Sequence, residues 1–288
     1  MSGAGPVDAM DVAPARERAG RAVADVIASE WLKLRSVRST YYVLGAAALI
    51  VVLTALLTWQ AVSAWDGLPA ATRARWKGIA VEEYFLPFVQ LVIGVLGVIA
   101  ITGEYSTGMI RTSLVAVPRR GRLLAGKAVA LAAVTLAAGT AVLFAVVAVE
   151  AWVVGDRPFP GHPVSLAEKT PLLACMGLSV MVMALVAFGL ATLTRSTAAA
   201  IVAVVGLTFV LPTLALNVLP HPWDRRVAMF MPTNLPDQLA GWTPPQDILQ
   251  GPFARSAGLP PLAALAVLAA YVVVFVGAAA LRFSRSDP

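Results

Sequence analysis

The run AALIVVLTALL (Ala47–Leu57) decides the fold class of this sequence. It lies inside Tyr41–Trp65, a stretch without a single formally charged side chain. A helix needs about 20 mostly apolar residues to cross roughly 30 Å of hydrocarbon. A strand of a transmembrane barrel would instead alternate apolar and polar residues over about 10 positions. The run therefore predicts a transmembrane α-helix.

Five more charge-free stretches follow along the chain, so we expect an all-α integral membrane protein with six transmembrane helices. Of its 288 residues, 59% are hydrophobic and 13% are charged, whereas average soluble domains have about 25% charged residues. A disordered chain would be poor in hydrophobic residues and rich in charge, which excludes that class. The six-helix domain is expected over 41–288, with spans at about 41–65, 84–103, 128–149, 171–194, 196–219 and 259–281.

The distribution of basic residues predicts how these helices are oriented. Lys and Arg are concentrated in the first 40 residues, in the loop 104–127, at Arg195 and in the C-terminal tail. By the positive-inside rule, both termini and the loop 104–127 are cytoplasmic. The net charge of +6 is then a topology signal, and we expect no nucleic-acid partner. Arginine far outnumbers lysine, and alanine and valine are abundant, which indicates a high-GC bacterium and its inner (plasma) membrane.

The N-terminal 40 residues divide into two segments. Residues 1–15 are expected to be a disordered leader. Over residues 16–40, apolar side chains recur at helical spacing on one face, which predicts a cytoplasmic amphipathic helix lying in the membrane interface. Trp31 would then lie at headgroup depth, with Lys33, Arg35 and Arg38 facing anionic membrane lipid. The alternative is a cytoplasmic extension of the first span.

The basic loop GEYSTGMIRTSLVAVPRRGRLLAGK (Gly103–Lys127) is the most informative segment. Helical spacing of apolar residues begins near Met109, and Pro118 ends the helix. Glu104 and Arg111, seven residues apart, are expected to share a face and to pair. A short amphipathic helix between two spans is suited to transmit force from a cytoplasmic partner. The alternative is that its bases only enforce topology.

The same loop contains the beginning of a phosphate-binding motif. Gly121, Gly126 and Lys127 fit G-x-x-x-x-G-K, but the next residue is Ala128 rather than the Ser or Thr that would hold Mg²⁺. A membrane span, not a strand and helix pair, surrounds it. We therefore expect no ATP binding through this motif.

Three segments together resemble the membrane subunit (permease) of ABC transporters of the ABC-2 export type. They are SEWLKLRSVRSTYY (Ser29–Tyr42), the loop Gly103–Lys127, and MFMPTNLPDQL (Met229–Leu239) in a long last outer loop. The resemblance implies that the chain pairs with a second permease copy, identical or different, and that each copy binds a separate ABC ATPase subunit. ATP and Mg would be bound by that ATPase, so no cofactor and no catalytic residue is expected in this chain. Short re-entrant helices are implied before the sixth span.

The resemblance also implies that the loop between the second and third spans docks on the ATPase. Importer permeases carry an E-A-A-x3-G loop, from which this sequence departs after Glu104, and the departure favours export. The coupling residues carried over to this chain are Glu104, Tyr105, Gly108, Arg111, Pro118, Arg119, Arg120 and Lys127.

The sequence leaves two other classes of protein as alternatives. A non-transporting membrane scaffold, immunity or sensor protein would need no ATPase. A membrane-embedded enzyme is disfavoured because no catalytic constellation is present. Proton-coupled transport is also disfavoured, since no carboxylate is expected deep within a span.

Several residues within the spans have two possible interpretations, one functional and one structural. Cys175, with Met176, Met181 and Met183, has the ligands of a soft-metal path, but methionine in an apolar helix more often fills gaps. A stripe of small residues in the second span permits close helix approach, either between two copies or within one chain. Pro87 and Pro212 are hinges or tolerated kinks. The stripe comprises Gly94, Gly97, Ala100 and Gly103.

Overall fold

The computed structural model describes residues 38–73, 80–108, 120–157, 166–241 and 258–285. Over these ranges the chain is helical and contains no strand. Six helical segments are long and apolar enough to cross a membrane, which confirms the predicted all-α membrane class. These segments are α2 (Arg38–Asp66), α4 (Val81–Thr107), α6 (Arg120–Val154), α7 (Leu166–Thr194), a fifth made of α8 (Thr197–Val205), η1 (Gly206–Val210) and α9 (Leu211–Val218), and α12 (Pro261–Arg285).

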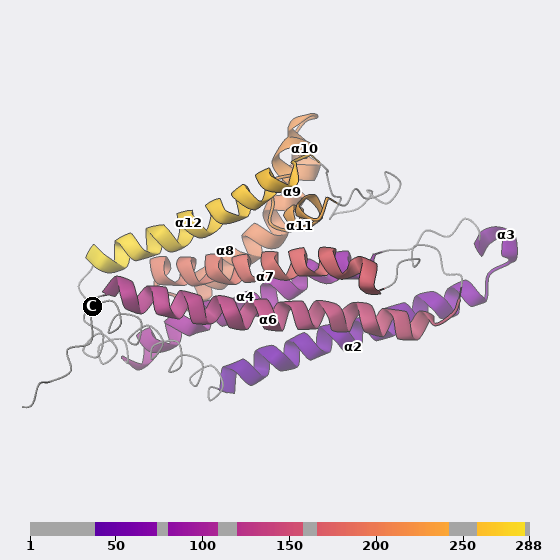
Figure 1. The fold of residues 1–288 in the computed structure, drawn as a ribbon, viewed down its shortest axis with the longest axis horizontal. Coiled ribbons are helices and arrows are strands. Elements are labelled where there is room, and N and C mark those ends of the chain that lie inside the picture. The colour runs from indigo at the N-terminus through magenta and orange to yellow at the C-terminus, as the bar shows by residue number, and fades with distance from the viewer. Residues whose placement is uncertain (1–37, 74–79, 109–119, 158–165, 242–257, 286–288) are drawn as a thin grey trace, which may run out of the picture.

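The long helices alternate in direction, so chain segments distant in sequence meet at two ends of the bundle. Figure 1 shows the start of α2, the start of α6 and the C-terminus at one end, and the short helix α3 (Ala70–Arg73) at the other. We call the first the inner end and the second the outer end. The end of α4 and the start of α6 both lie at the inner end, on either side of residues 109–119.

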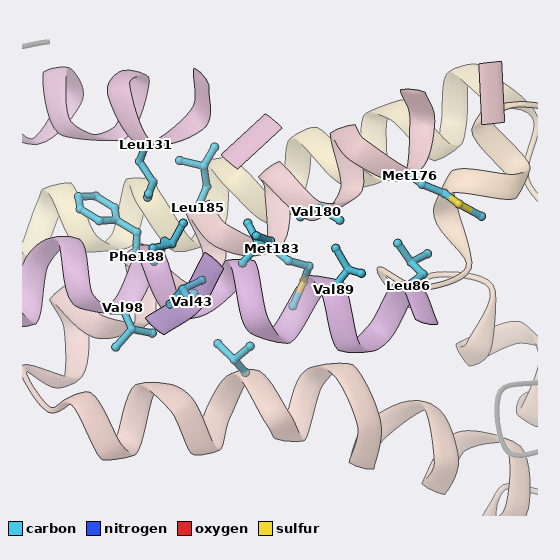
Figure 2. Packing of buried hydrophobic residues seen from close by; sticks show 14 of the residues in the cluster. Val43, Leu86, Val89, Val98, Leu131, Met176, Val180, Met183, Leu185 and Phe188 are labelled. Atoms are coloured by element: carbon cyan, nitrogen blue, oxygen red, sulfur yellow. The ribbon is translucent and has the colours of Figure 1, made fainter. Parts of the chain in front are cut away.

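Helices α4, α6 and α7 form the centre of the bundle. Leu86 and Val89 of α4 belong to the same apolar cluster as Val180, Met183 and Phe188 of α7, and all five side chains are fully buried (Figure 2). In the most apolar window of α7, 78% of the residues are buried, compared with 17% in α12. Because lipid tails are as apolar as leucine, van der Waals packing between helices supplies most of the stabilisation. Helix α7 is therefore the central element of the fold.

Small residues of α4 allow it to approach α7 closely. A Cβ atom at Gly97 would collide with the backbone carbonyl of Ala184, and one at Gly94 would touch Val204 and Ala187. At Gly103 a Cβ would meet nothing within 4 Å. At Gly94 and Gly97 the stripe of small residues is thus a contact within one chain.

The fifth span contains a π-helical turn, η1, directly before Pro212. The amide of Leu211 donates to the carbonyl of Gly206, five residues earlier instead of four. Proline has no N–H, and its ring conflicts with the carbonyl four residues back, here that of Thr208. Widening the preceding turn removes that conflict, so Pro212 accounts for the irregularity.

Two short helices precede the sixth span, α10 (Trp223–Ala228) and α11 (Leu235–Leu239). The resemblance had implied short helices in this loop. The first four residues of α11 are buried, and Leu235 packs with Val186 of α7 and with Ala264 and Leu268 of α12. Although α11 belongs to a loop, it is part of the core.

Candidate functional sites at the two ends of the bundle

A buried ion pair joins α4 to α6 at the inner end. The Nζ atom of Lys127 lies 2.6 Å from Oε1 of Glu104, and the two side chains are 2% and 8% exposed. Removing one partner of a buried pair leaves an uncompensated charge, which typically costs about 3–5 kcal/mol. The structure thus shows Lys127 as one partner of Glu104. Arg111 lies outside the described residues, so its expected pairing with Glu104 stays a prediction.

Tyr105, the residue after Glu104, contacts the hairpin between α7 and α8. The guanidinium of Arg195 lies 5.8 Å from the centroid of the Tyr105 ring, within the range of a cation–π interaction. Arg195 adopts a left-handed backbone conformation (φ 56°), and Ser196 then caps α8 by accepting a hydrogen bond from the amide of Ala199. Arg195 was used in the sequence only to assign topology. A single charged residue between two long apolar runs was the available signal that Arg195 lies in the turn between two spans, at the inner end.

Gly108 ends α4. Its φ of 71° is left-handed, a conformation that glycine adopts without steric cost and that commonly follows the last residue of a helix. Arg120 is the first residue of α6. The glycines and the lysine of the apparent phosphate-binding motif lie within α6, so the loop that such a motif needs is replaced by helix.

The remaining predicted site residues lie partly within and partly outside the described ranges. Arg38, expected at the end of the interfacial helix, is the first residue of α2. Outside the described residues lie Trp31, Lys33 and Arg35, the leader 1–15 and the rest of the interfacial helix, together with Arg111, Pro118 and Arg119.

At the outer end, three buried charged side chains from three helices meet. Nζ of Lys169 (α7) lies 3.0 Å from Oε1 of Glu82 (α4) and 3.6 Å from Oε2 of Glu150 (α6). The exposed fractions are 9% for Lys169, 2% for Glu82 and 5% for Glu150. We call these three residues the outer triad. It was missed in the sequence because charged residues were taken as the limits of spans, whereas α4, α6 and α7 continue through them.

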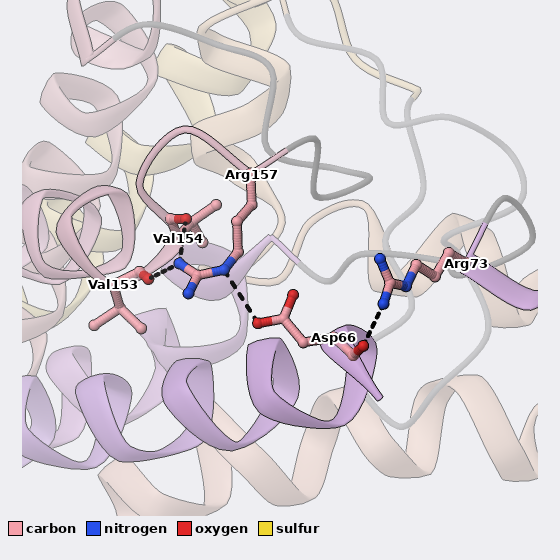
Figure 3. A network of polar contacts seen from close by, with 5 residues as sticks. All are labelled: Asp66, Arg73, Val153, Val154 and Arg157. Carbon is pink, nitrogen blue, oxygen red and sulfur yellow. Dashed lines mark hydrogen bonds and ion pairs between the residues drawn. The ribbon is translucent and has the colours of Figure 1, made fainter. Parts of the chain in front are cut away.

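A second polar contact at the outer end is exposed. Nε of Arg157 donates to Oδ2 of Asp66 at 3.2 Å, and its Nη1 donates to the last carbonyls of α6, those of Val153 and Val154 (Figure 3). Arg73 donates to the backbone carbonyl of Asp66. Asp66 and Arg157 are each 45% exposed, and such surface pairs contribute little to stability.

Between the two ends, a buried hydrogen-bond network fixes the segment that links α10 to α11. Nε2 of Gln90 (α4) donates to Oγ of Ser179 (α7) at 2.8 Å and to the carbonyl of Pro232 at 3.2 Å. Oγ of Ser179 donates to the same carbonyl at 2.7 Å. The loop before α11 is thereby bonded to both central helices.

The side chains of this segment also stabilise it internally. Nδ2 of Asn234 donates to the carbonyl of Ala228, and Nε2 of Gln238 donates to that of Met229. Oε1 of Gln238 accepts from the amide of Leu259, just before α12. These bonds satisfy backbone groups that would otherwise be buried without partners, which is a costly condition in an apolar environment.

The methionines next to Cys175 pack in the core. Met176 and Met183 are fully buried among apolar side chains of α4 and α7, whereas Cys175 is half-buried. Among the described residues no group of His, Cys, Asp and Glu is placed to hold a metal ion. The positions of these methionines favour the gap-filling role.

A family model described as "ABC-2 family transporter protein" matches residues 26–213. The matched range covers more than half of the chain, from before α2 into α9, and includes both the Glu104–Lys127 pair and the outer triad. No curated protein matches the chain significantly.

Proposed function

This chain belongs to the ABC-2 family of transporter proteins, and from that premise we propose that it is the permease subunit of an ATP-driven exporter. In this proposal a separate ABC ATPase subunit binds ATP and Mg, and a second permease copy completes the translocation path. In the same proposal the protein lies in a bacterial plasma membrane with both termini in the cytoplasm. Trp31, Lys33, Arg35 and Arg38 contact membrane lipid.

The observation that carries the coupling proposal is the buried Glu104–Lys127 pair. The pair fixes α4 to α6 close to the points where the chain enters and leaves residues 109–119. A displacement of that segment by a bound ATPase would therefore move α4 and α6 together. ATP binding would bias the equilibrium between inward-open and outward-open states through its differential affinity for them.

The eight coupling residues divide into two groups by position. The first group lies in or beside α4 and α6 and fixes the helix ends that flank residues 109–119; it comprises Glu104, Tyr105, Gly108 and Lys127. The others would meet the ATPase itself, because they lie in the segment or at the first residue of α6: Arg111, Pro118, Arg119 and Arg120.

The first test is charge reversal in the segment. The double variant Arg119→Glu/Arg120→Glu should still insert in the membrane, but its affinity for the ATPase subunit that copurifies with the wild-type chain should fall about tenfold or more, equivalent to about 1.4 kcal/mol. Affinity is measured with the purified complex in lipid nanodiscs. The matched control is Arg225→Glu/Arg226→Glu on the exposed surface of α10, which should bind the ATPase normally.

Unchanged binding by the first double variant would contradict the coupling assignment. If no ATPase copurifies with the wild-type chain, a non-transporting scaffold, immunity or sensor protein is the better account. A neighbouring reading frame with G-x-x-x-x-G-K-[ST] would support the exporter. Export itself predicts a compound that is present in the medium of cells carrying the gene and retained by cells lacking it.

A further inference from the structure

The outer triad contains two carboxylates and one ammonium group, all at least nine-tenths buried. Burying ions is expensive, and replacing a buried ion pair by apolar residues is often neutral or stabilising. Stability alone therefore gives a poor account of why three helices place charges at one point. Ionisable groups inside membrane proteins more often serve a function, and a buried pair is best attested as a register or switch element.

The geometry of the triad is asymmetric. Lys169 is within hydrogen-bond distance of Glu82, at 3.0 Å, and only in ionic contact with Glu150, at 3.6 Å. An ammonium group has three donors and can exchange acceptors by rotating its stem. In the described part of the chain, Oε2 of Glu82 accepts no hydrogen bond, so Lys169 is the partner shown for this carboxylate.

We propose that Lys169 is a charge switch: when the outer end of α4 separates from α7, its ammonium group passes from Glu82 to Glu150. This inference rests on the proposed transport function, because transport requires the outer end to open. With one carboxylate, separation would strand a buried cation. With two carboxylates on different helices, the cation keeps a partner in both arrangements.

The Glu104–Lys127 pair at the inner end differs from the outer triad. Glu104 and Lys127 form a direct contact of 2.6 Å between α4 and α6, which suits an attachment that stays closed. Helix α4 thus has a fixed attachment to α6 at its inner end and an exchangeable attachment at its outer end. This arrangement lets α4 tilt about its inner end, so that a small movement near residues 109–119 becomes an opening at the outer end.

The test compares two variants that remove the same charge from the same cluster, Glu82→Gln and Glu150→Gln. Both are made in a Cys175→Ala background with Leu172→Cys as reporter. Leu172 is buried on α7, three residues from Lys169, and becomes reactive only if the outer end opens. The chain alone, in lipid vesicles without nucleotide, is labelled with a membrane-impermeant maleimide.

The switch predicts opposite effects. Glu82→Gln leaves Lys169 with Glu150 and should raise the labelling rate, whereas Glu150→Gln leaves the pairing shown here and should hold the rate at or below that of wild type. We expect the two rates to differ by at least about fivefold, the lower end of typical coupling between states. The control is Asp66→Asn, which removes the charge of Asp66 from the exposed pair with Arg157 and should leave the labelling rate unchanged.

Equal increases in both variants would mean that the triad is a static clamp, and no change in either would mean that it is a spectator; both results overturn the proposal. Should the Gln variants fail to insert, Glu82→Asp and Glu150→Asp each lengthen one contact and should show the same opposite effects on the labelling rate.

Adding the ATPase and ATP distinguishes failure of the charge switch from failure of the proposed ATP coupling. If ATP leaves labelling unchanged but the variants still oppose one another, ATP coupling fails and the switch stands. If ATP changes labelling and the variants do not differ, the switch alone fails.

Discussion

Lys127 shows how strongly the surroundings of a residue determine its structural role. In the sequence it ends an apparent phosphate-binding motif and also belongs to a topology-setting cluster of bases. In the structure its side chain is 2% exposed and bonded to Glu104. Burial against the carboxylate of Glu104 makes Lys127 a link between α4 and α6, a role that follows from this contact and not from its charge alone.

Gly97 carries the prediction at the residue scale. Gly97→Ala places a methyl group against the carbonyl of Ala184, so α4 and α7 must move apart. Such overpacking should lower stability by about 1–3 kcal/mol, measured as a lower midpoint of thermal unfolding in nanodiscs. Gly103→Ala is the matched control, because its Cβ meets nothing within 4 Å and alanine is the better helix former. Equal midpoints for the two variants would contradict the close contact between α4 and α7.

At the scale of elements, the sequence predicts which segments are helices better than it predicts where they end. Charge-free runs indicate all six spans because a membrane helix must be apolar over most of its length. Their limits were placed before Glu150 and after Glu82 and Lys169, yet all three lie within helices. Charged residues end an apolar run, but a helix continues through them when they find partners across the bundle. Such pairings join residues far apart in sequence and leave no local pattern.

Helix α11 was harder to predict: the family resemblance implied short re-entrant helices in this loop, but the local pattern of MFMPTNLPDQL does not show which core residues they contact. Its position depends on Gln90 and Ser179, each more than 50 residues away in the sequence. The sites at the inner and outer ends also differ in how far the sequence could predict them. The coupling loop could be proposed from local spacing and resemblance, whereas the outer triad required the fold.

The element-scale prediction concerns the attachment of that loop. Gln90→Leu removes the donor that α4 supplies to Ser179 and to the carbonyl of Pro232, while Ser179 keeps its own bond to Pro232. We expect local opening of residues 228–239 to become about tenfold more frequent, as for the loss of one or two buried hydrogen bonds. Hydrogen exchange followed by mass spectrometry measures it. Gln60→Leu on the exposed face of α2 is the control, and equal exchange in both variants would count against the network.

At the scale of the whole molecule, orientation in the membrane is the quantity that the other proposals need. In a Cys175→Ala background, Asp156→Cys just after the end of α6 and Gly121→Cys at its start place exposed thiols beyond and within opposite ends of this helix. In intact cells, a membrane-impermeant maleimide should label the first, and it should label the second only after permeabilisation. The expectation follows from the positive-inside rule. Reversed labelling would put residues 109–119 outside the cell and would remove the coupling proposal.

The near-complete burial of α7 has a practical consequence for engineering cargo preference. A helix enclosed on nearly all sides by its own chain has little surface left to offer a passing molecule. Under the proposed export function, libraries intended to alter the choice of cargo should therefore diversify the outward faces of α2, α8, α9 and α12, where side chains are exposed. Large changes at the fully buried positions of α7 would disturb the packing of α4, α6 and α12 against it.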